Sequence, residues 1–340
     1  MPLPARRALM EELAVIVPVA SFEPLSVLKK SVDCLLDLEK GDLDVRVTYV
    51  LDLKEGADDR LKFLEEMPVA VLSRMDNRGR RAGAVNDALA AYGTMPDYIA
   101  LFDVDSRPLR NFLVECVDAL RSNRDAIIAS SARFVTNSDE NIVTQTIAAE
   151  YFFFSDVYRI FKMVGGFNQF NGLIGVLNMK LMEEHRFNRL NESVSCEDLD
   201  FTQKAYLSGL VGVFVPETLV GEQAPSSIRD LFNQRVRWLT GAYQGLRTYL
   251  ESFLRSKIPV SRRLAWFLAL TLPFVAFLAT PLVPLYGLLL WQRYGLRRGI
   301  VRTFGLIAHL WLITLCGIVA LKKQVIGRGV EWKESRRSEV

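Results

Sequence analysis

The chain has 340 residues, 50% of them hydrophobic, and a formal net charge of only +3. This length can bury the core of one large α/β domain and leave a smaller appendage. The small net charge argues against a general nucleic-acid-binding surface, so no nucleic-acid partner is expected. The 4 cysteines stand singly, which excludes the paired spacing of a zinc site and the density of a secreted disulfide scaffold.

Short apolar runs alternate with helical patterns over the first part of the chain. The expected strands are 13–19, 45–53, 69–73, 98–106, 126–131 and 211–216. The expected helices are 25–38, 82–91 and 111–123, followed by a long amphipathic segment at 143–163. This β-α-β alternation predicts a doubly wound α/β domain with a parallel sheet.

The last third of the chain changes in composition. An amphipathic helix rich in Arg, Trp and Tyr is predicted at 228–250, and such a helix can lie in a lipid headgroup layer. The nearly uncharged segments 264–291 and 304–321 predict membrane helices. A hairpin near Pro281 would make three crossings rather than two. Either count exports one basic segment, against the positive-inside rule.

These patterns predict a domain organisation. We expect a catalytic domain at 1–227, an interface helix region at 228–262, a transmembrane domain of two or three helices at 263–322, and a basic tail at 323–340. The apolar segments make this a multi-pass membrane protein by expectation. No apolar run of signal-peptide length follows the N-terminus, so the catalytic domain is expected to stay in the cytoplasm. The aromatic run at 151–154 fits a core role and a membrane-facing or lid role equally well.

A pair of carboxylates follows one of the buried strands. Asp103 and Asp105 end the strand at 98–106, at the edge where parallel sheets bind ligands. Two carboxylates there can hold Mn²⁺ or Mg²⁺ bridging a diphosphate. The same spacing recurs at 42–44 and 198–200, so the place after a buried strand selects this pair.

Two further motifs lie downstream. Glu197 and Asp198 precede a helical pattern, where capping and helix-dipole compensation also account for an acidic pair. Gln234, Arg237 and Trp238 fall on one helix face, three and four residues apart. Because the chain has only 5 tryptophans, this Q-x-x-R-W spacing is the most specific of the motifs.

In this order, the motifs resemble those of family 2 glycosyltransferases of the cellulose-synthase-like branch. The resemblance implies a GT-A nucleotide-sugar-binding fold, in which Asp198 is the catalytic base with Glu197 beside it and Asp103 and Asp105 hold the metal. Arg81 stands where the family's Gly-Lys-Ala-Gly turn has its lysine. The segment 170–180 resembles the family's acceptor-side loop, although Asn178 and Met179 replace its usual arginine pair. The implied substrate-binding residues are Pro18, Asp52, Arg81, Asp103, Gly172, Gln234, Arg237 and Trp238.

The residue types also fit the reaction chemically. Glycosyl transfer needs cations that stabilise the diphosphate leaving group and a base that takes the acceptor proton, and one displacement inverts the anomeric centre. Similarity to lipid-linked mannosyl transfer implies GDP-mannose as donor and a polyprenyl- or dolichyl-phosphate-linked acceptor, with UDP-glucose and UDP-N-acetylglucosamine left open.

Four alternative functions fit the sequence less well. A processive polysaccharide synthase using a UDP-sugar would need more membrane helices to enclose a polymer channel. A non-enzymatic, membrane-tethered sugar-nucleotide sensor would need neither Asp198 nor Trp238. Dinucleotide oxidoreductases and P-loop NTPases are disfavoured because the chain has neither G-x-G-x-x-G after its first strand nor a Walker loop.

Overall fold

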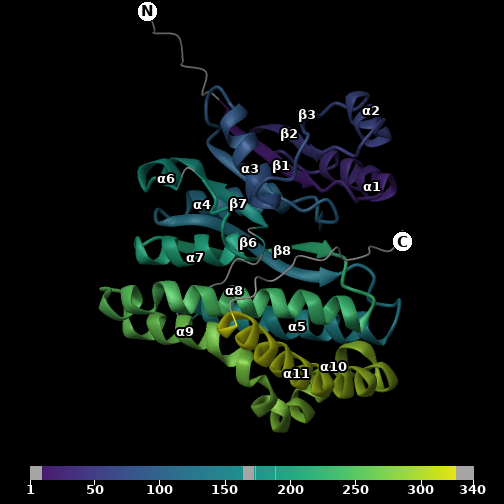
Figure 1. The fold of residues 1–340 in the computed structure, drawn as a ribbon, viewed down its shortest axis with the longest axis vertical. Helices are drawn as coiled ribbons and strands as arrows, with labels where there is room; N and C mark the ends of the chain where they lie inside the picture. The colour runs from purple at the N-terminus through teal and green to yellow at the C-terminus, as the bar shows by residue number, and fades with distance from the viewer. Residues whose placement is uncertain (1–9, 164–171, 173, 188, 327–340) are drawn as a thin grey trace, which may run out of the picture.

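The computed structural model describes residues 10–163, 172, 174–187 and 189–326. Figure 1 shows a sheet with helices on both of its faces, and a layer of long helices across one end of the molecule. The chain passes from the α/β part into the layer of long helices more than once, because α5 and the helices after β8 both belong to this layer.

Eight strands form one sheet in the order β3-β2-β1-β4-β7-β6-β8-β5 among the described residues. The strands are β1 (Glu11–Val19), β2 (Leu43–Asp52), β3 (Ala70–Arg74), β4 (Tyr98–Leu101), β5 (Arg107–Pro108), β6 (Ala126–Val135), β7 (Gly175–Asn178) and β8 (Val211–Glu222). β1 to β4 are parallel, as expected, but β7 runs antiparallel to both β4 and β6, and β5 runs antiparallel to β8. The sheet is therefore mixed, which corrects the expectation of a purely parallel one.

Both faces of the sheet are covered, because β1 buries successive side chains on opposite sides. One core packs against α1 (Leu25–Leu36), α2 (Asp59–Glu65) and α4 (Phe112–Arg121). The other packs against α3 (Arg80–Ala91), α6 (Met179–Glu184) and α7 (Glu197–Leu207). The α/β architecture that the sequence predicts is confirmed.

The helical layer consists of α5 and the C-terminal helices. Its members are α5 (Ile142–Met163), α8 (Ile228–Arg255), α9 (Val260–Thr271), the 3₁₀ helix η2 (Leu272–Leu282), α10 (Val283–Tyr294) and α11 (Leu296–Val325). Two stretches, Val260–Tyr294 and Leu296–Val325, are long and apolar enough to cross a membrane. Pro281 lies inside η2, and the break between the two apolar stretches is at Gly295, whose φ is 79°.

The aromatic run at 151–154 is divided between half-buried and exposed positions. Phe152 is half-buried in the helical layer, with Tyr286 and Tyr294 around it. Phe153 and Phe154 remain exposed on α5. All four cysteines are free, as expected from their isolated positions.

α8 approaches the start of α7 closely at one glycine. A Cβ atom at Gly241 would lie 2.5 Å from Sγ of Cys196, closer than real Cβ contacts. The Cys196 thiol also donates a weak hydrogen bond to the backbone carbonyl of Arg237, 3.8 Å away. Gly241 therefore sets how near α8 can come to Glu197 and Asp198, which begin α7.

We expect Gly241→Ala to destabilise the protein by about 1–2 kcal/mol, since overpacking typically costs roughly 1–3 kcal/mol and alanine in a helix returns at most about 1. Gly245→Ala is the matched control on the same helix, because its Cβ would meet only Leu270 at 3.9 Å. That variant should be as stable as wild type or slightly more so. Thermal unfolding of the detergent-purified variants measures both changes. If Gly241→Ala melts at or above the wild-type temperature, the helices do not constrain each other at this point.

Candidate functional site

The carboxyl ends of β1, β2 and β4 meet at one edge of the sheet. Asp103 follows β4 and begins a tight turn, in which its backbone N–H donates to Oγ of Ser106 at 3.0 Å and its carbonyl accepts from the Ser106 N–H at 2.9 Å. The Asp105 carboxylate accepts a long hydrogen bond from the Gln223 N–H at 3.4 Å. The turn therefore places both carboxylates where a parallel sheet presents ligand-binding residues.

Arg81, in the first turn of α3, joins two of the predicted motifs. Its Nε donates to Oδ1 of Asp103 at 2.7 Å, and its Nη1 donates to Oε1 of Glu197 at 3.1 Å. Burial by itself would lower the pKa of Arg81, but the charges of Asp103 and Glu197 raise it above the ordinary value. Nη2 is buried without a hydrogen-bond partner, which leaves one donor for a ligand.

Asp198 lies at the start of α7, where its carboxylate accepts hydrogen bonds from the backbone N–H groups of Gly172 and Leu199. Burial raises the pKa of Asp198, and the neighbouring charge of Glu197 raises it further. The hydrogen bonds from Gly172 and Leu199 oppose this rise only in part. A buried carboxylate with a raised pKa is a stronger base than an ordinary aspartate, which suits proton abstraction.

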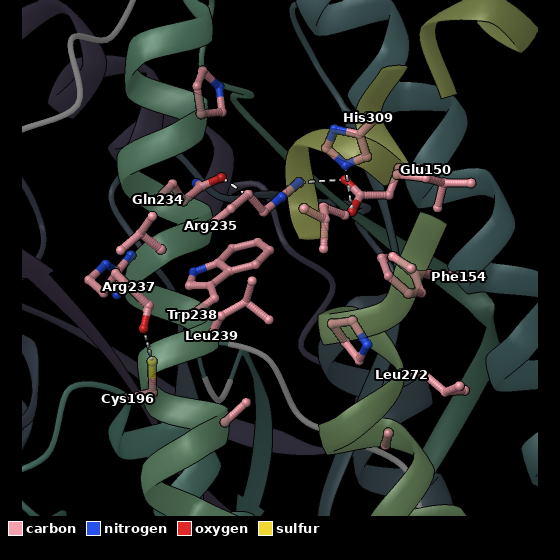
Figure 2. Close-up of a pocket in the computed structure, with 18 of the residues that line it drawn as sticks. Glu150, Phe154, Cys196, Gln234, Arg235, Arg237, Trp238, Leu239, Leu272 and His309 are labelled. Carbon is pink, nitrogen blue, oxygen red and sulfur yellow. Dashed lines mark hydrogen bonds and ion pairs between the residues drawn. The ribbon is translucent and has the colours of Figure 1, made fainter. Parts of the chain in front are cut away.

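The Q-x-x-R-W residues extend the site along α8, together with a residue that the motif does not specify. Arg235 is buried, its Nη1 donates to Oε1 of Gln234 at 3.0 Å, and its guanidinium lies 4.1 Å from the centroid of the Trp238 ring. Its Nη2 donates to the buried carboxylate of Glu150 on α5. His309 of α11 lies on the other side of that carboxylate, with Nε2 3.1 Å from Oε1. Figure 2 shows this chain of contacts beside Trp238.

Glu150 and Arg235 were not among the predicted site residues. They pair across 85 positions of the sequence, and no local spacing reveals such a pair. Burial by itself would raise the pKa of Glu150, but the charges of Arg235 and His309 lower it to about 2. The carboxylate is therefore a permanent anion that holds Arg235 beside Trp238.

A single cavity of about 1130 Å³ brings these groups together. Among the predicted site residues, it is lined by Arg81, Asp103, Asp105, Gly172, Glu197, Asp198, Gln234, Arg237 and Trp238. The cavity continues from these polar side chains to an apolar wall of Phe153 and Phe154 of α5 and residues of α9, η2, α10 and α11. Figure 2 shows Phe154 and Leu272 on this apolar side. The site can therefore accommodate a charged and an apolar group at the same time.

Two predicted residues lie outside this lining. Pro18 is half-buried within β1, and Asp52 ends β2, with Oδ1 3.3 Å from Nε of Arg74. Burial raises the pKa of Asp52, and the nearby charge of Arg74 opposes that rise. Phe22, which follows β1, does line the cavity. Both residues therefore lie in strands beside the cavity and are not part of its lining.

The segment compared with an acceptor-side loop is only partly described. Residues 170, 171 and 173 lie outside the described residues, whereas Gly172 does line the cavity. Asn178 pairs with Tyr98 at the start of β4, and the Met179 N–H donates to the carbonyl of Asp97 at 3.0 Å. Asp103 follows the opposite end of β4. Asn178 and Met179, which replace the family's arginine pair, therefore lie at the end of β4 opposite to Asp103.

Asp103 and Asp105 could contribute to a metal site. Among the described residues, no group of three or more His, Cys, Asp or Glu side chains could hold an ion by itself. Yet both carboxylates line the cavity together with Glu197 and Asp198, and the charge of Glu197 adds to the burial that raises the pKa of Asp198. Two hard oxygen donors at an anionic site suit Mg²⁺ or Mn²⁺, which take their remaining ligands from water and phosphate.

Comparisons with known sequences agree with the motifs. The profile described as "Glycosyl transferase family group 2" matches residues 98–321. A probable glucomannan 4-beta-mannosyltransferase 7 of Oryza sativa subsp. japonica is 25% identical over 258 residues, which cover 72% of this chain and 43% of that protein. Glucomannan 4-beta-mannosyltransferase 1 of the same plant is 29% identical over 188 residues, 54% of this chain and 35% of that protein. The chain thus spans less than half the length of these curated relatives.

Two solved structures have the same architecture. The mannosyltransferase PcManGT from Pyrobaculum calidifontis, solved in complex with GDP-Man and Mn²⁺, aligns with a TM-score of 0.62 and 16% identity over 95% of this chain and 89% of its own. TarS from S. aureus aligns with a TM-score of 0.51 and 14% identity over 92% of this chain and 54% of its own. At these identities the likeness bears on the fold. Since the family profile covers more than half of the chain and the fold agrees with it, this protein belongs to glycosyl transferase family group 2 and has a GT-A-like α/β fold with a mixed sheet.

Proposed function

We propose that this protein is an inverting, metal-dependent hexosyltransferase that transfers mannose from GDP-mannose to a polyprenyl- or dolichyl-phosphate-linked acceptor. The observation that carries the proposal is the single cavity in which Asp103, Asp105 and Asp198 share a space with an apolar wall of C-terminal helices. The printed descriptions of the relatives support mannose as the sugar, and the bound ligands of PcManGT support GDP-mannose and Mn²⁺.

In the proposed reaction, Asp198 accepts the proton of the acceptor hydroxyl as the oxygen attacks the anomeric carbon from the face opposite the diphosphate. Arg81 and Arg237 stabilise the negative charge that develops on the departing diphosphate. A divalent cation held by Asp103 and Asp105 would neutralise part of the same charge. Trp238, held by Arg235, provides an aromatic surface at the acceptor end of the cavity.

The apolar wall supports a lipid-linked acceptor, because a purely hydrophilic glycan gains nothing from it. We propose that the protein is attached to a membrane by the helices that form this wall, with the catalytic domain on the cytoplasmic face. We keep the division proposed above, with a catalytic domain at 1–227, an interface region at 228–262, a membrane domain at 263–322 and a basic tail. The interface region consists mostly of α8, and several residues of this helix line the cavity.

A polysaccharide acceptor is the second candidate, because the two rice relatives are described as glucomannan mannosyltransferases. A panel of GDP-mannose, UDP-glucose and UDP-N-acetylglucosamine with purified protein distinguishes the cases. We expect mannose transfer to a polyprenyl phosphate and little to a β-mannan oligosaccharide. Preferred transfer to the oligosaccharide would favour the second candidate. Stoichiometric donor binding without turnover for any acceptor would instead identify a sensor.

We predict that Asp198→Asn lowers kcat by about 100- to 10,000-fold with little change in donor affinity, because the amide keeps the size of the carboxylate but cannot take a proton. Asp200→Asn is the control, since Asp200 lies in the same first turn of α7 but binds Tyr249 and Lys204 outside the cavity lining. Its turnover should remain near wild type. A folded Asp198→Asn protein that works within a factor of three of wild type would exclude Asp198 as the base.

We predict that EDTA abolishes turnover and that added Mn²⁺ or Mg²⁺ restores it. Asp105→Asn should raise the Mn²⁺ concentration needed for half-maximal rate and weaken donor binding, because one hard oxygen ligand loses its charge. Asp44→Asn is the control, because Asp44 belongs to the D-x-D sequence at 42–44, which is exposed at the start of β2. Full turnover in EDTA, or equal metal dependence of both variants, would contradict a metal at Asp103 and Asp105.

A further inference from the structure

α11 contacts the α/β domain and its helical layer at both of its ends. Near its start, Nη1 of Arg298 lies 3.8 Å from Oδ1 of Asp139, which precedes α5. Near its end, the Cys316 thiol donates to the carbonyl of Phe232 on α8 at 3.7 Å, and Lys323 lines the same cavity as Asp103. Neither end of the helix therefore extends away from the catalytic part of the molecule.

The contact is continuous between these ends. A Cβ atom at Gly305 would lie 2.2 Å from Oγ1 of Thr146, so α11 and α5 cross at close range. One turn later His309 meets Glu150, and Leu312 then packs on a cluster that includes Leu231 of α8. α11 packs against both α8 and α5, and Figure 1 shows it running obliquely below them.

The length of this contact is incompatible with a simple crossing. From Arg298 to Lys323 the helix is roughly 37 Å long at about 1.5 Å per residue. The hydrocarbon core of a bilayer is about 30 Å thick. If α11 crossed the bilayer, then α5 and α8, which pack against it, would have to enter the hydrocarbon with it. These two helices bear the candidate site and several charged side chains, which are costly to place in hydrocarbon.

The polar residues of α11 agree with this orientation. Its buried positions recur on one face and include Arg302 and His309. Arg302 lies with its guanidinium 3.6 Å from the centroid of the Tyr294 ring. Both basic side chains thus face protein. The opposite face exposes Phe304, Trp311, Leu315 and Ile318, which are apolar.

The preceding apolar stretch lies alongside α11 and adds to the same surface. The Phe277 N–H of η2 donates to Oγ1 of Thr314 at 3.2 Å, and a Cβ atom at Gly287 of α10 would lie 2.7 Å from Oγ1 of Thr303. The exposed leucines of this stretch that do not line the cavity are Leu264, Leu285, Leu288 and Leu289. Together the two stretches form one broad apolar surface on the side away from the sheet.

Charge decides what covers this surface. Residues 256–326 contain nine Lys and Arg and no Asp or Glu. The basic residues gather at 257–263, 293–302 and 322–323, near the ends of the two apolar stretches, and all of them except the buried Arg302 can contribute to a basic rim. Such a basic rim complements anionic phospholipid headgroups, and apolar side chains inside it complement acyl chains.

We propose that the helices of residues 260–325 lie embedded in one leaflet of a bilayer, roughly parallel to its plane, and that neither apolar stretch crosses it. This arrangement keeps all three basic groups on the side of the catalytic domain. Two crossings would export the group at 293–302, and three would export the group at 322–323, each against the positive-inside rule. The arrangement is independent of the sugar and of the reaction.

Cysteine labelling of the full-length protein tests the proposal. The protein is reconstituted into sealed vesicles of phosphatidylcholine and phosphatidylglycerol and treated with a membrane-impermeant maleimide. The variants are R297C at the start of α11, K322C near its end and L285C on the apolar surface of α10, all at exposed positions. K40C, on the exposed surface of the catalytic domain, reports which molecules face outward. The wild type, with its four free cysteines, gives the background.

We expect R297C and K322C to be labelled to the same extent as K40C, and L285C to be labelled only after detergent is added. Protection of R297C with labelling of K322C would show two crossings and overturn the proposal. Protection of K322C with labelling of R297C, or labelling of L285C by reagent trapped inside the vesicles, would show three crossings and also overturn it.

Discussion

The repulsion between the carboxylates gathered at one edge of the sheet is the constraint on which the site depends. Asp103, Asp105, Glu197 and Asp198 line one cavity. Two like charges about 4 Å apart repel by roughly 4 kcal/mol at an effective dielectric constant of about 20. Arg81 offsets this repulsion by pairing with Asp103 and Glu197 at once. It thereby links β4, α3 and α7. A charged ligand that binds in the cavity changes the electrostatic energy of these four carboxylates and of Arg81.

The predicted residues Asp103, Asp105, Glu197 and Asp198 line one cavity because strand and helix ends converge at one edge of the sheet. Asp103 and Asp105 could be selected by the buried strand before them, and Glu197 and Asp198 by the helix after them. The mixed sheet could not be predicted, since β7 is four residues long and carries no periodicity that separates it from a loop. Arg235 could not be assigned either. Its role depends on a pairing with Glu150 that only the fold creates.

Hydropathy identified the apolar segments but not their orientation. A window of apolar residues measures length, and both apolar stretches satisfy that condition. Orientation depends instead on which side chains of each helix are buried, and His309 is buried on the side of α11 toward α5, where its Nε2 lies 3.1 Å from Oε1 of Glu150. Two crossings and three crossings each export one basic segment, so the basic residues support neither count. Contacts along the whole of α11 supply the information that composition lacks.

Glu150 connects the proposed site to the apolar helices. Its carboxylate is shared by Arg235 of α8, which lies against Trp238, and by His309 of α11. Removing one partner of a buried ion pair is costly, because the remaining charge is left without compensation. The position of Trp238 therefore depends on α5 and α11 as well as on its own helix. For this reason the apolar helices are part of the site's framework, and a lipid surface bound to them would lie directly beside the acceptor end of the cavity.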